Sequence, residues 1–200
     1  MAAKANRFTS RDLITIGVFN ALILVIYTIL AAILNSIPVV NFFFGGIAAA
    51  VLAPIYLLMV TKVRKRGVFL LSACIFSLLM LFLGLWLAVP IILLGALLAD
   101  GLAGNRDYRD LLRLTLAYLI FKLAEMGGFV LLFTVGADRY ADRLDGAARE
   151  QFVQGMQLMT WWLWAILLGL TGLGAIAGGF LAKGLFRKHL EKAGVLGMSS

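Results

Sequence analysis

Two charged side chains, Lys122 and Glu125, lie within the apolar run from Leu111 to about Val135. They are three residues apart, so a helix places them on one face. A charge at membrane depth is costly unless it is paired or faces water, and it is a functional candidate by default. Three interpretations are open: an internal ion pair that fixes packing, the lining of a ligand cavity, or a proton relay.

Aromatic and polar residues at the ends of the apolar runs form a second set of candidates. Aromatic belts at membrane interfaces produce such a pattern without any ligand. A pocket for a flat or largely apolar molecule uses the same residue types. The candidate substrate-binding residues are therefore Lys122, Glu125, Asn41, Phe43, Trp86, Tyr140, Trp161 and Trp162.

The sequence offers little for catalysis or metal binding. His189 is the only histidine and lies in a basic tail, while the single Cys74 lies in an apolar run. A metal hydrolase needs clustered ligands, and a Ser–His or Cys–His nucleophile needs a histidine within reach. We therefore expect no enzymatic activity, no metal site and no cofactor.

The composition indicates the elements that must position these residues. Hydrophobic residues make up 62% of the 200 residues and charged residues only 14%, with a mean hydropathy of +1.00. Soluble proteins are far less apolar. The net charge of +8 is explained by Lys and Arg in cytoplasmic loops rather than by nucleic-acid binding. We expect one all-α domain in the lipid bilayer.

Six apolar runs are long enough, or nearly so, to cross a bilayer as helices. They cover about 13–34, 42–60, 68–87, 89–103, 111–135 and 161–182. Fourteen of the eighteen Lys and Arg residues lie on the side of the termini, and three lie in the segment 136–160 on the other side. This asymmetry predicts cytoplasmic N- and C-termini and an extracellular 136–160 segment. The expected location is the cell membrane of a prokaryote, as a multi-pass protein.

The first run carries a stripe of small residues at helical spacing: Gly17, Ala21, Thr28 and Ala32. Close backbone approach at small residues is what holds membrane helices together, because lipid tails are as apolar as leucine. The stripe is suited either to a helix of another subunit or to packing within the chain itself.

The polar segment 136–160 also has a pattern. Tyr140, Leu144, Ala148, Phe152 and Met156 recur every four residues. This spacing predicts a helix on the outer surface. Either it is a solvated interface helix or it caps an opening.

Four stretches resemble the substrate-binding S component of energy-coupling factor (ECF) transporters, and more narrowly its MptD-like branch. They are RDLITIGVFNAL at 11–22, APIYLLMVTKVRKRG at 53–67, LLGALLADGLAG at 93–104 and KHLEKAGV at 188–195. The resemblance implies an ECF S-component-like bundle of six helices. It also implies that the first helix docks on a membrane coupling (T) subunit through an AxxxA face, here Gly17 and Ala21, with glycine replacing the first alanine.

The same resemblance implies a function. An S component of an ECF-type ABC importer captures a micronutrient outside, such as a vitamin, cofactor or metal chelate, and two cytosolic ATPases drive its delivery. Metal-ion members carry N-terminal histidines, which this chain lacks, so nickel and cobalt are disfavoured. Lys122 with clustered aromatics suits an anionic, partly aromatic ligand. The alternatives are a self-contained small carrier or channel that uses Lys122 and Glu125, and a membrane scaffold without a ligand.

Overall fold

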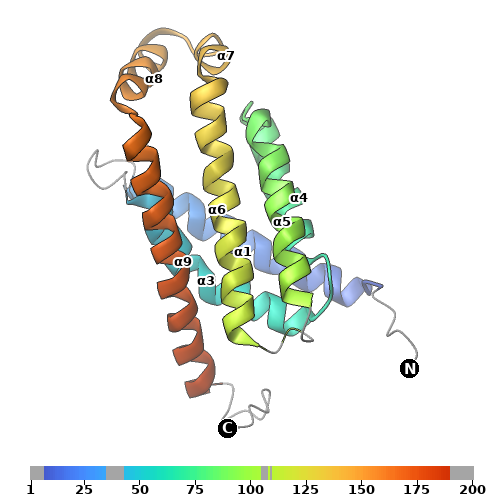
Figure 1. Ribbon diagram of the computed structural model, residues 1–200. Coiled ribbons are helices and arrows are strands. Elements are labelled where there is room, and N and C mark those ends of the chain that lie inside the picture. The colour runs from blue at the N-terminus through green and yellow to red at the C-terminus, as the bar shows by residue number, and fades with distance from the viewer. Residues whose placement is uncertain (1–6, 35–42, 105–107, 109, 190–200) are drawn as a thin grey trace.

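The computed structural model describes residues 7–34, 43–104, 108 and 110–189, and all its regular elements in these ranges are helices. Figure 1 shows their arrangement. In chain order they are α1 (Ser10–Leu34), α3 (Phe44–Val63), α4 (Val68–Phe82), the 3-10 turn η1 (Trp86–Ala88), α5 (Val89–Ala103), α6 (Leu111–Val135), α7 (Ala137–Ala141), α8 (Gly146–Leu158) and α9 (Trp161–His189). The predicted all-α class is confirmed.

Five of these helices are long and apolar enough to cross a membrane: α1, α3, η1 with α5, α6 and α9. The third predicted run, 68–87, is shorter as a helix, because α4 ends at Phe82 and a turn with Gly84 at a φ of +76° follows. Such a backbone conformation favours glycine and interrupts a helix. The count of six spans and the cytoplasmic termini stay predictions.

The start of α1 is capped by two nearby side chains. Thr9 and Asp12 cap the helix reciprocally: the Asp12 amide donates to Thr9 Oγ1 at 3.3 Å, and the Thr9 amide donates to Asp12 Oδ2 at 2.8 Å. Each bond satisfies an amide that the first helical turn leaves unpaired. Lys65, in the turn after α3, adds an ion pair to Asp12 at 2.6 Å. This end of α1 is thereby tied to the α3–α4 turn.

The glycines of α9 allow it to pack closely against α3 and α6. A Cβ on Gly174 would collide with the backbone of Gly46, and one on Gly178 would lie 2.6 Å from the Ala50 carbonyl oxygen. A Cβ on Gly179 would meet Thr115 of α6. Because any side chain here would push the helices apart, these glycines set the distance between the helix axes.

Helix α1 is the least enclosed of the long helices. Only Ile16, Asn20 and Ile23 of its 25 residues are buried. Asn20 Nδ2 donates to Ser72 Oγ of α4 at 3.0 Å and lies 3.6 Å from Met59 Sδ of α3. This small polar contact fixes which face of α1 turns inward, because a buried amide must keep its hydrogen-bond partners.

The molecule has two distinct ends. Helices α7 and α8 lie together at one end, which we call the α8 end, and the C-terminal end of α9 lies at the other (Figure 1). The turn at Gly84 that precedes η1 reaches the α8 end too, because Arg143, just after α7, donates to the Gly84 carbonyl oxygen. By the predicted topology the α8 end faces the outside of the cell.

Candidate functional site

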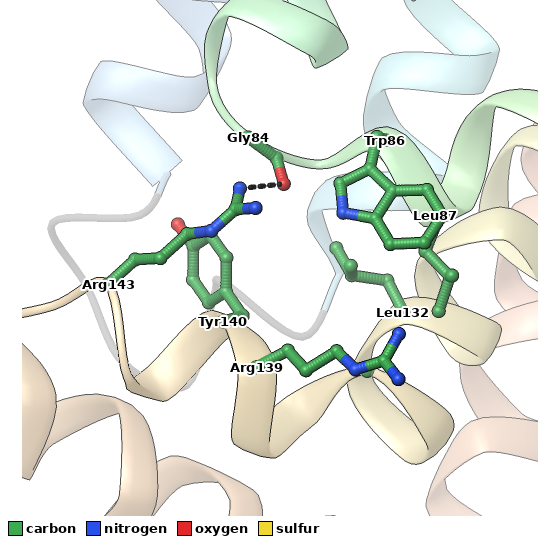
Figure 2. A pocket seen from close by; sticks show the side chains of 8 residues that line it. Gly84, Trp86, Leu87, Leu132, Arg139, Tyr140 and Arg143 are labelled. Carbon is green, nitrogen blue, oxygen red and sulfur yellow. Dashed lines mark hydrogen bonds between the residues drawn. The ribbon is translucent and has the colours of Figure 1, made fainter.

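A recess lies at the α8 end between the turn before η1, the end of α6 and the region of α7. We call it the Trp86 recess. Its lining residues are Gly84, Trp86, Leu87, Leu132, Gly136, Arg139, Tyr140 and Arg143. Figure 2 shows the Arg143 side chain reaching toward the turn at Gly84, with the Trp86 ring across from it. Apolar groups, two arginines and two polar aromatic rings thus line one recess, and Figure 2 shows the Arg143 guanidinium beside Gly84 and the Arg139 guanidinium beside Leu132.

The turn at Gly84 is shaped around Arg143. Arg143 Nη1 donates to the Gly84 carbonyl oxygen at 3.1 Å. A Cβ on Gly84 would lie only 2.8 Å from the same Nη1, and the φ of +76° is itself unfavourable for other residues. Glycine is therefore required here both for the backbone and for the approach of the guanidinium.

The electrostatics of the Trp86 recess are one-sided. Two arginines line it and no carboxylate does. The acidic residues nearest in sequence are Asp138 and Asp142, both exposed. Asp142 is engaged elsewhere, with its Oδ1 lying 3.7 Å from Arg149 Nη2. The lining itself therefore carries two positive charges and no negative one, and both arginines, like the two aspartates, are exposed.

The size of the recess limits what it can hold. Its enclosed volume is about 10 Å³, which is about the space of a single water-sized group and far below that of pockets that enclose a whole ligand. A larger molecule can therefore reach the lining only with one small terminal group, while the rest of it stays outside.

An aromatic cluster connects the recess to α8. Tyr140 lies 5.1 Å from Phe152 of α8, centroid to centroid, and Phe152 lies 5.6 Å from Phe133 of α6. Phe133 also stacks on Trp164 of α9 at 6.3 Å with an interplanar angle of 11°. Such ring pairs each add modest directional stabilisation to the burial of apolar surface. Tyr140 belongs to both groups and so links the recess to α8 through a direct ring contact.

The Lys122–Glu125 pair is buried among rings. Lys122 Nζ donates to Glu125 Oε2 at 2.6 Å, and the two residues are 5% and 7% exposed. Lys122 Nζ also lies 5.3 Å from the ring centroid of Tyr56, and it is within 6 Å of those of Tyr118 and Phe121. The ammonium group is satisfied by a carboxylate and by π-faces. This geometry favours the interpretation as an internal ion pair.

The other predicted residues fall in different places. Trp86 and Tyr140 line the recess together. Phe43, Trp161 and Trp162 are 47%, 83% and 51% exposed and do not line it. Asn41 lies outside the described residues.

The predicted docking residues are both exposed on α1. A Cβ on Gly17 would have open space around it, and Ala21, one helical turn further on, is exposed as well. The chain's own described helices therefore leave both positions uncovered.

Arg139 and Arg143 were not predicted as site residues. In the sequence they stand among Asp138, Asp142 and Asp145 and resemble an ordinary solvated surface. Their four-residue spacing was the available signal, because it places both on one side of a helical segment. Their meeting with Trp86 joins segments more than fifty residues apart, which no local pattern reveals.

The described residues contain no group of three or more His, Cys, Asp or Glu side chains that would hold a metal ion. Comparison with curated proteins and with solved structures found no match. A family model described as hypothetical bacterial integral membrane protein (Trep_Strep) matches residues 10–192. With an all-helical fold, five apolar helices of spanning length and a match over nearly its whole length, the chain belongs to this Trep_Strep family of bacterial integral membrane proteins.

Proposed function

We propose that the chain is the substrate-binding S component of an ECF-type importer in the prokaryotic cell membrane. It captures a micronutrient at the α8 end and passes it on through a membrane coupling subunit. ATP hydrolysis belongs to two cytosolic partner ATPases. The proposal combines the sequence resemblance with one structural observation, the uncovered small-residue face of α1.

The contrast between glycines carries this proposal. Gly174 and Gly178 of α9 are in tight contact with α3, whereas Gly17 of α1 has nothing within 4 Å of an added Cβ. Small residues in membrane helices favour close approach of another helix. An exposed small-residue face on a helix with only three buried residues is what a docking surface for another subunit requires.

The Trp86 recess is the candidate place for substrate binding, separate from the α1 face proposed for docking. It combines ring surfaces with positive charge at the end that the predicted topology places outside. The buried Lys122–Glu125 pair is satisfied within itself, so we do not assign it as the coupling site of a self-contained carrier.

The test replaces Gly17 and Ala21 by leucine. Bulky side chains on the α1 face are expected to prevent copurification of the coupling subunit and to abolish uptake, while the purified protein stays folded. The matched control is Gly169→Leu, because Gly169 is an exposed glycine of α9 that also has open space around an added Cβ. Normal uptake by the Gly17→Leu/Ala21→Leu variant would refute the proposal.

A further inference from the structure

We propose that the Trp86 recess binds a single anionic group, a carboxylate or a phosphate. The group is carried either by the imported molecule or by a lipid head group. In the first case this inference rests on the proposed function and names the charge of its ligand. In the second it is a lipid site of the membrane protein, independent of transport.

The argument starts from the unused hydrogen-bond donors of Arg139 and Arg143. A guanidinium has five N–H donors in a fixed plane that matches carboxylate and phosphate oxygens. Arg143 uses one N–H to donate to the Gly84 carbonyl oxygen, and this hydrogen bond holds the Arg143 side chain at the recess. Arg139 lines the recess and is exposed, and none of the hydrogen bonds and ion pairs among the described residues involves its side chain, so the donors of Arg139 are open to solvent or to a ligand. Figure 2 shows it extending past Leu132 along the recess.

The second step is the contrast with Lys122. The sequence suggested this residue as the partner of an anionic ligand, but its charge is neutralised by Glu125 at 2.6 Å. The positive charges of the Trp86 recess have no such carboxylate in the lining. An incoming anion therefore gains charge-assisted hydrogen bonds there without having to displace an existing ion pair.

The third step concerns the apolar part of the recess. Leu87 and Leu132 form apolar lining, and Trp86 adds an indole N–H donor beside a flat ring. Both arginines are themselves exposed to solvent, so these apolar side chains contribute a surface for the apolar part of a ligand rather than shielding of the charges. The geometry thus favours an anion attached to an apolar body, as in an aromatic carboxylate or an acidic phospholipid.

The experiment measures binding to the purified full-length protein in neutral detergent at constant ionic strength. The probes are benzoate, inorganic phosphate and phosphatidylglycerol, with chloride and phosphatidylcholine as reference. Any ligand that binds only the folded state raises the melting temperature. The variant is Arg139→Gln/Arg143→Gln, and its matched control is Arg11→Gln, an exposed arginine of α1 outside the recess.

We expect at least one anionic probe to stabilise the unmodified protein and the Arg11→Gln control. Loss of both charged donors weakens that binding roughly tenfold to a hundredfold or more. Stabilisation by benzoate or phosphate identifies a free anion, and stabilisation by phosphatidylglycerol alone identifies a lipid head group.

The inference is overturned if no anionic probe stabilises the protein, or if the arginine variant responds as the unmodified protein does. An unchanged melting temperature of the variant without probe shows that it folds. Because this assay uses no partner subunit, its failure leaves the α1 docking test unaffected. Failure of docking likewise leaves the anion site standing.

Discussion

The spacing of Lys122 and Glu125 along the helix predicts their contact with each other but not the residues that surround them. The i to i+3 placement of Lys122 and Glu125 predicted their pairing as one of three interpretations, and the 2.6 Å contact realises it. The rings of Tyr56 and Phe69 around Phe121 come from α3 and α4, so no pattern within one helix foretells them. Pairing within a helix is local information, whereas the surroundings of the pair depend on how helices pack.

At this scale we predict strong coupling between Lys122 and Glu125. Lys122→Met leaves a buried carboxylate unpaired and is expected to lower the free energy of unfolding by about 3–5 kcal/mol. The double variant Lys122→Met/Glu125→Leu removes both charges and is expected to lie within about 1 kcal/mol of the unmodified protein. Denaturant or thermal unfolding in detergent measures both. Equal losses in the single and the double variant would instead indicate that the pair faces water or a ligand.

Elements were predicted well where apolar runs end at clear signals. The predicted runs 89–103 and 111–135 coincide with α5 and α6. The start of α6 is fixed by Asp110, which accepts from the amides of Leu112 and Arg113. The segment 136–160 is different. Its four-residue repeat predicted one helix, but α7 ends at Ala141 and α8 begins at Gly146, where φ is +53°. The periodicity continues across the break because both helices turn rings toward α6.

The aromatic contacts of α8 make a prediction about this element. Phe152→Ala removes the ring that contacts both Tyr140 and Phe133, so α8 is expected to detach more often. Hydrogen exchange of the amides in 146–158 measures this and should become faster. Val153→Ala is the control, since Val153 is partly exposed on the same helix and belongs to none of these ring contacts. Equal exchange in both variants would mean that the rings do not hold α8.

At the scale of the whole molecule, some features follow from local sequence and others depend on contacts between residues far apart in the chain. Helix class and membrane location follow from composition, and the family match covers residues 10–192. The helix pairing follows from glycines such as Gly46 and Gly174, whose partners lie more than a hundred residues away. The recess at the α8 end depends on that pairing. In the sequence its arginines therefore resemble ordinary surface residues, and only the fold brings them together with Gly84 and Trp86.

The orientation of the molecule gives the last prediction. Fourteen Lys and Arg residues on the side of the termini against three in 136–160 predict that the α8 end lies outside the cell. In a Cys74→Ser background, Asp145→Cys should react with a membrane-impermeant maleimide added to intact cells. Lys183→Cys, near the other end of α9, should react only after the cells are opened, and both positions are exposed. The reverse labelling would place the Trp86 recess in the cytoplasm, where it would have no access to an external micronutrient.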